Sequence, residues 1–380
     1  MSSQPIFLLR CISCYAFVSP FCVVTITQGE QQSFVRANED AAHPGPPVKS
    51  PEAVGEYVVE IYEDRNGHIW FGTMAKGVAR FDGKALSYFD SSDGLPSDTI
   101  SSIVEDRDGH LWFGTHGGVA KYDGKAFRNF TTADGLADDR VTRILPDGSG
   151  NLWISTFNGV TMYDGTNFRA FPLPIPKSKG PRTVGPFQIP GRQWVRDILI
   201  DRRGHIWFSR DGYGVCRYDG KRFTHFLMDD GLASNSVFSM TEDGRGNVWF
   251  ACVQHQGWFT SGATRKNPGD DGGACFFDGK KISNVGGIDY EKGNNVFTVY
   301  TDRTGSVWIS NIGRGMFRYD GKTLLNFNKT DQPGEEMVPV QSVLEDRHGR
   351  LWFGCSGGLY RLIDDKFVAI NVDGPWPSRD

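Results

Sequence analysis

Side chains suited to holding a polar molecule occur in this 380-residue chain mainly where a repeated pattern of residues is interrupted. They are aromatic rings that can stack on a sugar ring, cationic groups that can bond to oxygen atoms, and amides that both donate and accept hydrogen bonds. We predict as ligand-binding residues Trp194, Arg196, Arg210, Tyr213, Asn235, His255, Trp258, Asn294, Arg314 and His116.

Signals of catalysis are missing from the sequence. It contains no Ser-His-Asp spacing, no pair of CxxC motifs at metal-binding spacing and no glycine-rich phosphate loop. We therefore predict a binding protein with no catalytic residues, no cofactor and no metal.

The repeat that must position these residues is clearest in Ile100–Leu136, and seven copies of it run through the chain. Each copy has a Trp, an Asp six residues before it, and an aliphatic residue six residues before that Asp. The Trp residues are Trp70, Trp112, Trp153, Trp207, Trp249, Trp308 and Trp352. The Asp residues are Asp64, Asp106, Asp147, Asp201, Asp243, Asp302 and Asp346. Because they recur in every copy, we expect the Trp in the core and the Asp in a turn.

Within one copy, apolar residues alternate too closely for a helix, and Gly or Asp-Gly interrupts them every five to eight residues. This pattern predicts four short strands, named A to D, which in the clearest copy are Ile100–Glu105, Leu111–Thr115, Val119–Tyr122 and Ala126–Phe130. The Asp123-Gly124 pair predicts a type I′ turn between strands C and D, and the last copy has Asp364-Asp365 there. A period near 42 residues with four strands per unit predicts an all-β fold, a seven-bladed β-propeller with four antiparallel strands per blade.

The run DGL-x4-V-x5-D-x2-G-x2-W-φ-G/S-T-x2-G-φ-x-R/K-Y/F-DG resembles the two-component regulator propeller repeat, found in extracellular sensor regions of hybrid histidine kinases. The resemblance implies a propeller that binds or senses a ligand, often of carbohydrate origin. No transmembrane, kinase or response-regulator region follows the last copy. We therefore expect a stand-alone propeller whose partners are a small polar or carbohydrate-like ligand and a separate sensor kinase or other signalling protein.

Ligand sites of propellers usually lie over the central channel, on the face made by the D–A and B–C loops, which we call the loop face. Six of seven copies carry an acid or amide two residues before the strand A aliphatic: Glu56, Asp98, Asp139, Gln193, Asn235 and Asn294, with Val338 in the seventh. These groups could bind sugar hydroxyls or a hydrated cation, or could serve only as Asx turn residues. The B–C loops vary freely at His116, Phe157, Asn158, Arg210, Asp211, Tyr213, His255, Gln256, Asn311 and Arg314.

Two insertions lengthen the ring on the loop face. The Trp153 to Trp207 interval is 54 residues, with its extra length before strand A of the fourth copy, and the Trp249 to Trp308 interval is 59 residues, with its extra length in a B–C loop. Long irregular loops in a compact domain are usually functional or disordered. We expect the aromatic residues Trp194, Trp258 and Phe259 to be exposed there as stacking surfaces.

Composition and charge limit the other possibilities. Residues 1–29 resemble an export signal, residues 30–55 a disordered Pro-rich lead-in, residues 56–373 the propeller and residues 374–380 a C-terminal tail. We expect an exported, periplasmic or extracellular protein whose mature chain does not insert into a membrane. The 41 basic and 45 acidic residues are interspersed, with no basic stripe for nucleic acid.

Export would permit disulfides. Cys252 ends strand B and Cys275 begins strand C of the fifth copy, so they flank one insertion and could form a bridge. The alternative is a pair of buried free thiols that pack as small hydrophobic groups. We expect Cys216 and Cys355, which lie in different copies, to be unpaired.

Two other functions fit a propeller. One is a metal-dependent lyase resembling the streptogramin lyases, which use a His base and Mg²⁺; only His116 and His255 are placed for this role. The other is a scaffold for protein partners. His68, His110, His205 and His348 lie at A–B turns, which favours turn chemistry over metal binding.

Overall fold

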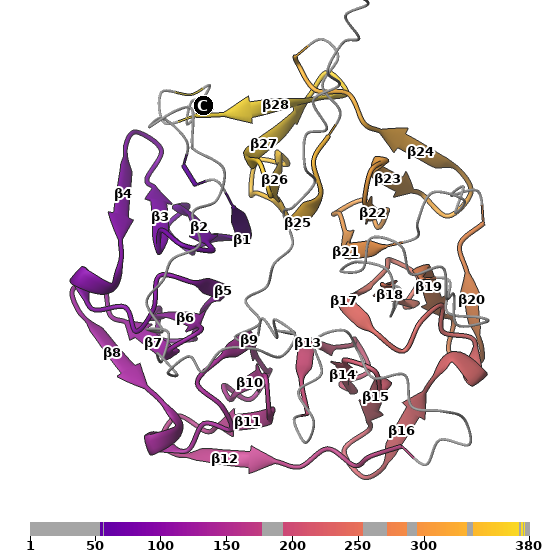
Figure 1. The fold of residues 1–380 in the computed structure, drawn as a ribbon, viewed down its shortest axis with the longest axis horizontal. Coiled ribbons are helices and arrows are strands. Elements are labelled where there is room, and N and C mark those ends of the chain that lie inside the picture. Colours follow the sequence, from indigo (N-terminus) through magenta and orange to yellow (C-terminus); the bar gives the residue numbers. More distant parts are fainter. Residues whose placement is uncertain are drawn as a thin grey trace, which may run out of the picture. The chain divides into compact units, whose positions relative to one another are not determined.

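The computed structural model describes residues 54–55, 57–176, 193–253, 272–286, 295–332, 337–371, 374 and 376. The chain divides into two units, Met1–Pro51 and Glu52–Asp380, and every described residue belongs to the second. The described residues of this unit contain 28 strands, which form seven four-stranded antiparallel sheets arranged as the blades of a ring (Figure 1). The prediction of a seven-bladed β-propeller is therefore confirmed.

Each blade runs in sequence order from its inner strand A to its outer strand D (Figure 1). The first three blades are β1 (Val58–Glu63), β2 (Ile69–Thr73), β3 (Val78–Phe81) and β4 (Leu86–Phe89); β5 (Ile100–Glu105), β6 (Leu111–Thr115), β7 (Gly118–Tyr122) and β8 (Phe127–Phe130); and β9 (Val141–Pro146), β10 (Leu152–Thr156), β11 (Gly159–Tyr163) and β12 (Phe168–Phe171). Blades four and five are β13 (Val195–Ile200), β14 (Ile206–Arg210), β15 (Gly214–Tyr218) and β16 (Phe223–Phe226), and β17 (Val237–Glu242), β18 (Val248–Cys252), β19 (Gly273–Phe277) and β20 (Ile282–Asn284). Blades six and seven are β21 (Val296–Thr301), β22 (Val307–Asn311), β23 (Gly315–Tyr319) and β24 (Leu324–Phe327), and β25 (Val340–Glu345), β26 (Leu351–Cys355), β27 (Gly358–Ile363) and β28 (Lys366–Ile370). Three short 3-10 helices, η1 (Ser91–Asp93), η2 (Thr132–Asp134) and η3 (Met228–Asp230), lie in D–A loops.

The repeated Trp and Asp bond to each other in all seven blades. The indole N–H of each Trp donates to the Oδ2 atom of the Asp six residues earlier, at 2.9 to 3.1 Å. The Oδ1 atom of the same Asp accepts backbone N–H groups of the A–B turn, as Asp64 does from Asn66 and His68. The predicted core and turn roles are confirmed, and a bond that the sequence analysis did not foresee joins them.

The hydrophobic core lies between blades. Seven buried clusters each combine the Trp of one blade with the residue after the Trp in the next blade, as Trp70 of blade one does with Phe113 of blade two. Truncating a fully buried Trp to Ala typically costs about 3–5 kcal/mol. A single blade has no partner for either face, so the ring is the smallest unit that buries these residues.

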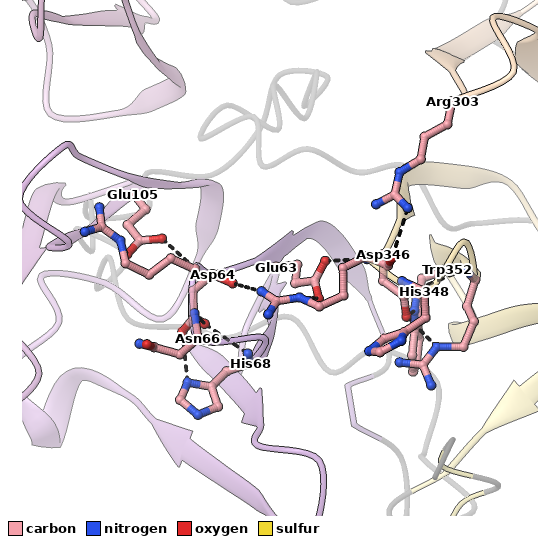
Figure 2. Close-up of polar contacts among 12 residues, drawn as sticks. Glu63, Asp64, Asn66, His68, Glu105, Arg303, Asp346, His348 and Trp352 are labelled. Atoms are coloured by element: carbon pink, nitrogen blue, oxygen red, sulfur yellow. Dashed lines mark hydrogen bonds and ion pairs between the residues drawn. The ribbon is translucent and has the colours of Figure 1, made fainter. Parts of the chain in front are cut away.

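The ring closes between blades seven and one without an exchanged strand among the described residues. Trp352 packs on Phe71, and Trp376, from beyond the last strand, stacks on Phe81 with ring centroids 4.3 Å apart. On the face of the A–B turns, Arg347 of blade seven donates from its backbone N–H and its Nε to Glu63 of blade one, at 2.7 and 2.6 Å. Figure 2 shows Glu63 and Asp64 of blade one beside Asp346 of blade seven at this junction. Side-chain packing therefore closes the ring, and these bonds add to it.

The C–D turns differ from the type I′ turn predicted at Asp123-Gly124. A type I′ turn needs positive φ at both central residues, but in this turn only Gly124 has it, at 94°. The loop instead runs over four residues between Tyr122 and Phe127, and the Asp123 carboxylate accepts the N–H groups of Lys125 and Ala126. The seventh blade does form the two-residue hairpin, with φ of 49° at Asp364 and 60° at Asp365.

Candidate functional site

Aromatic and cationic side chains are stacked along the loop face from blade two to blade six. Phe157 stacks on Trp194 with ring centroids 4.1 Å apart, and the Arg196 guanidinium carbon lies 3.8 Å from the centroid of the Trp194 ring. The other side of the same guanidinium faces Phe238, whose ring centroid is 3.6 Å from that carbon. His116 and Phe297 extend the series at its two ends by edge-to-face contacts. We call His116, Phe157, Trp194, Arg196, Phe238 and Phe297 the stacked row.

Backbone irregularities position three members of this row. Arg196, Phe238 and Phe297 are the second residues of the inner strands β13, β17 and β21. In each of these strands the register with strand B shifts across that residue. A bulge of this kind leaves one residue outside the ladder and redirects its side chain, which accounts for three large side chains at equivalent positions of successive blades.

Arg196 is the charged centre of the row. Its side chain is 8% exposed, and its Nε lies 3.9 Å from the Oδ1 of Asp211, which also accepts a hydrogen bond from Ser236. Burial lowers the pKa of Arg196 to about 10, and the nearby Asp211 carboxylate opposes this shift. Arg196 therefore stays charged at neutral pH, and its guanidinium plane lies between two ring faces as in a cation–π pair.

The expectation that the indole of Trp194 is exposed is wrong. The Trp194 side chain is only 5% exposed because Phe157 covers one face and Arg196 the other. Phe157 and Phe238 are half-buried. Within the described row, these two phenylalanines offer more ring surface to a ligand than Trp194 does.

His116 begins the row at the B–C loop of blade two. Burial lowers the pKa of its imidazole to about 4, while the charge of Asp138 acts in the opposite direction. Arg140, bonded to Asp138, places its guanidinium carbon 4.4 Å from the Phe157 ring centroid. At neutral pH His116 is therefore an uncharged imidazole beside a second arginine–phenylalanine stack.

In three blades, the acid or amide two residues before strand A forms a hydrogen bond within the D–A turn. Asp98, Asp139 and Asn235 accept the N–H of the residue seven positions earlier, which is the first residue of η1, η2 and η3, at 2.6 to 2.9 Å. Gln193 instead accepts a bond from Arg210. Of the two alternatives for this ring of side chains, the turn role has direct hydrogen bonds in the structure.

Tyr213 and Arg314 lie in B–C turns as predicted, whereas Arg210 is the last residue of strand β14. Arg210 is fully buried and donates to the backbone oxygen of Pro174 as well as to Gln193, with its guanidinium carbon 4.7 Å from the Tyr213 ring centroid. Burial lowers its pKa. The Arg314 backbone bonds to Asn311 and Asn326. Arg210 thus bonds to described residues on both sides of the segment 177–192.

Several predicted residues lie outside the part of the chain that the structure describes. They include His255, Trp258 and Asn294 of the predicted ligand site, together with Glu56, Gln256 and Phe259.

Charged side chains from three blades meet in the central channel beneath the loop face. Arg143 of blade three donates from Nη1 to both carboxylate oxygens of Glu60 of blade one, at 2.9 and 3.2 Å, and its Nε lies 3.7 Å from Asp197 of blade four. Burial raises the pKa of Glu60 and that of Asp197, and Arg143 opposes both shifts. The Glu60 charge in turn raises the pKa of Arg143.

Glu60, Arg143 and Asp197 are each the third residue of an inner strand. Residues at this third position also link neighbouring blades elsewhere in the ring. Ser342, Ser102 and Asp197 accept the N–H of Ile61, Ile144 and Met240, which belong to the next blade, at 2.7 to 3.1 Å. Glu60 likewise accepts the N–H of Ile103. The sequence analysis missed this position, although the sequence held a signal. A polar residue stands third in every inner strand, followed each time by an aliphatic residue or Met: Glu60, Ser102, Arg143, Asp197, Ser239, Thr298 and Ser342.

One cluster in the described residues has metal-binding residue types, Asp106, Asp108 and His110. It lies in an A–B turn, where Asp106 already accepts bonds from the Trp112 indole and the His110 backbone, and the His110 ring nitrogen Nδ1 lies 3.2 Å from its carboxylate. These contacts account for the cluster as turn structure.

The ring of seven four-stranded sheets defines the class of this protein as a seven-bladed β-propeller. Five segments match the family model described as "Two component regulator propeller", at residues 54–75, 94–117, 135–158, 231–254 and 336–357. The two-component regulator propeller repeat that the sequence motif indicated is therefore present in five segments of the chain. No curated protein matches the sequence significantly.

Solved structures share the fold at low identity. The extracellular domain of BT3049, assigned to a hybrid two component system of B. thetaiotaomicron, is 17% identical with a TM-score of 0.60, covering 80% of this chain and 40% of that one. A streptogramin B lyase is 13% identical with a TM-score of 0.60, covering 82% and 94%. The GH74 enzyme of Niastella koreensis is 13% identical with a TM-score of 0.58, covering 83% and 54%. At these identities the likeness concerns the fold alone, and this chain spans less than half of BT3049.

Proposed function

We propose that this propeller is the ligand-binding or sensing module of an extracytoplasmic signalling system, and that a polar, carbohydrate-like ligand binds over the loop face at the stacked row. The observation that carries the proposal is the Arg196 guanidinium held between Trp194 and Phe238 at 3.8 and 3.6 Å. A stack fixed in this way is preorganised, so a ligand that binds against it loses little free energy in ordering the protein.

The chemistry of the row suits a sugar or a similar polar ring. The half-buried faces and edges of Phe157 and Phe238 can pack against C–H groups, and Arg140 beside Phe157 can donate to oxygen atoms. The predicted residues Trp258, His255 and Asn294, which lie outside the described residues, would complete the site from blade five and from the loop into blade six. The predicted Arg314 and Asn235 would contribute from the rim.

The presence of two-component regulator propeller repeats supports an extracytoplasmic location and a signalling partner, which we propose to be a separate sensor kinase or another signalling protein. Residues 1–29, predicted to be an export signal, lie outside the described residues. No helix among the described residues is long and apolar enough to cross a membrane. We propose no nucleic-acid partner and no membrane insertion of the mature chain.

A lyase reaction is the alternative function, because enzymes are among the solved structures that share this fold. A His base is most effective when its pKa lies near the working pH, and burial holds the pKa of His116 at about 4. His116 is therefore a weak base, which favours binding over a lyase reaction. A scaffold for protein partners remains the third function.

A glycan array on the purified chain, followed by titration of each hit, tests the proposal. Phe238→Ala should weaken binding by about 1–3 kcal/mol, as truncating an aromatic contact residue typically does. Tyr88→Ala is the matched control, because Tyr88 is an aromatic residue on β4, 46% exposed and outside the row. Binding that tolerates Phe238→Ala as well as Tyr88→Ala would rule out the row as the site. A chain that binds no glycan in the array would argue against a carbohydrate-like ligand.

A further inference from the structure

Two positions lie diagonally across strands B and C near the loop face of each blade. They are the last residue of strand B and the residue two after the Gly that opens strand C. Across the seven blades the pairs are Thr73 and Ala79, Thr115 and Ala120, Thr156 and Thr161, Arg210 and Cys216, Cys252 and Cys275, Asn311 and Phe317, and Cys355 and Tyr360. Cysteine fills both positions in blade five alone.

The two thiols of blade five are in contact. Cys252 pairs in register with Gly273 and Cys275 with Phe250, so the two cysteines lie on the same face of adjacent strands. Their sulfur atoms are 3.9 Å apart, both side chains are fully buried, and both are free thiols in the structure. Cys216 and Cys355 occupy one each of the same two positions in other blades, opposite Arg210 and Tyr360, and have no thiol across from them.

We propose that Cys252 and Cys275 form a site of reversible thiol oxidation that closes to a disulfide within blade five when the folded protein meets a small-molecule disulfide such as oxidised glutathione. The thiolate of one cysteine attacks a glutathione sulfur, forms a mixed disulfide and releases one reduced glutathione. The second cysteine then attacks the protein sulfur of that mixed disulfide and releases a second reduced glutathione. The two protein thiols lose two electrons and two protons, and the oxidant gains them as two glutathione thiols.

The local structure explains how the bond could form and what it would do. A disulfide bond is about 2.05 Å long, so the sulfur atoms must approach by roughly 2 Å. Gly273, opposite Cys252 with φ of 111°, gives strand C a backbone without a Cβ at this point. The bond would tie together β18 and β19, which frame the longest B–C loop. Because both thiols are buried, oxidation should wait for local opening and be slower than that of an exposed thiol.

Peptide mapping of the full chain tests the proposal. The folded protein is incubated with oxidised glutathione or with dithiothreitol, free thiols are alkylated, and the chain is digested with trypsin without reduction. Trypsin cuts at Arg265 and Lys266, which separates the two cysteines into the peptides 246–265 and 267–280. We expect these peptides to be linked after oxidation and separate after reduction. The linked form should also melt roughly 3–6 °C higher than the reduced form, as expected for one cross-link in a domain of this size.

The repeat supplies matched variants. Cys252→Thr and Cys275→Ala introduce residues that other blades use at the same positions, and each should abolish both the linked peptide and the shift in Tm. Cys355→Thr and Cys216→Ala make the same replacements in blades with a single cysteine and should abolish neither. Failure to recover the linked peptide after exhaustive oxidation of folded protein would overturn the proposal. So would Cys252 linked to a different cysteine, or a link that forms only in denaturant.

Discussion

The guanidinium group of Arg143 on the third blade bonds to the carboxylate of Glu60 on the first blade, so their ion pair passes over the second blade and crosses the channel. Most of the described contacts between blades join immediate neighbours, as the Trp–Phe packing does. This pair therefore constrains the ring in a different way, because it fixes the distance between two blades that do not touch through their cores. Asp197 extends the constraint to blades four and five through its contact with Arg143 and its bond from Met240.

Replacing Arg143 by Leu should lower the free energy of unfolding by about 3–5 kcal/mol at neutral pH, because it leaves Glu60 and Asp197 as buried carboxylates without a counter-charge. Chemical denaturation followed by tryptophan fluorescence measures the change. The double variant Arg143→Leu, Glu60→Leu removes both partners and should recover part of the loss. If the single variant is as stable as the starting protein, the ion pair does not hold the ring.

Stability of the Glu60→Gln variant should depend on pH in a defined direction. Burial raises the pKa of Glu60 above its ordinary value of 4.5, so folding favours the protonated carboxyl, and its contribution to stability is complete below pH 4.5 and declines as pH rises through the raised pKa. Gln cannot ionise. The difference in Tm between variant and starting protein should therefore move in favour of Gln as pH rises from about 4 to 7. A difference that is constant over this range, or that moves the other way, contradicts the raised pKa.

The seventh C–D turn offers a stabilising substitution. Asp365 has φ of 60°, which is strained for a residue with a Cβ and comfortable for Gly. Asp365→Gly should raise the free energy of unfolding by about 1 kcal/mol. Asp123→Gly, at the equivalent turn of blade two, should instead destabilise the protein, because Asp123 has no positive φ and its carboxylate caps two backbone N–H groups. Equal effects of the two substitutions would contradict this account of the turns.

The fold could be predicted because the same pattern of residues recurs in seven copies, and each copy indicates the same four strands. The strands predicted at Ile100–Glu105 and Leu111–Thr115 have the observed bounds, since alternation and Asp-Gly punctuation determine strands over a few residues. The turn type at Asp123-Gly124 was wrong for a local reason as well. The Asp side chain bonds forward to two N–H groups, which holds Asp123 at negative φ and lengthens the loop.

The candidate site was harder to predict because contacts between blades determine it. Nothing near Trp194 in the sequence indicates that Phe157, 37 residues before Trp194, covers its ring, or that Phe238, 44 residues after Trp194, lies on the far side of Arg196. Sequence reasoning identified loop residues that vary between copies. It named Arg196, the second residue of its inner strand, but passed over Phe238 at the equivalent position of the next blade and Arg143 at the third position of β9.

Replacing the repeated Asp of one blade should cost stability and alter the acid limit of the fold. Asp243 accepts the Trp249 indole N–H, the Asn247 side chain and two backbone N–H groups at 2.8 to 2.9 Å. Burial acts to raise its pKa, but these bonds outweigh burial and hold the pKa below the ordinary 3.8. Asp243→Ala should lower the free energy of unfolding by about 2–3 kcal/mol. Because a lowered carboxyl pKa stabilises the fold above pH 3.8 and this stability is lost as pH falls below it, the loss caused by Asp243→Ala should shrink toward pH 2. A loss independent of pH would contradict the ionised role of Asp243.

The last prediction separates the parts played by Arg196 and the aromatic residues in ligand binding. Lys keeps the charge of Arg196 but lacks the planar group that fits between Trp194 and Phe238. Arg196→Lys should therefore weaken binding of a glycan hit about as much as Phe238→Ala does, by about 1–3 kcal/mol. Trp258→Ala, on the blade-five loop, should weaken binding by a similar amount if that indole also stacks on the ligand.

Trp194→Ala should lower stability as well as affinity, because Trp194 is 5% exposed. Titration calorimetry gives each affinity and thermal unfolding shows which variants remain folded. Affinity unchanged in Arg196→Lys, Phe238→Ala and Trp258→Ala, each shown to be folded, would place the ligand away from the stacked row.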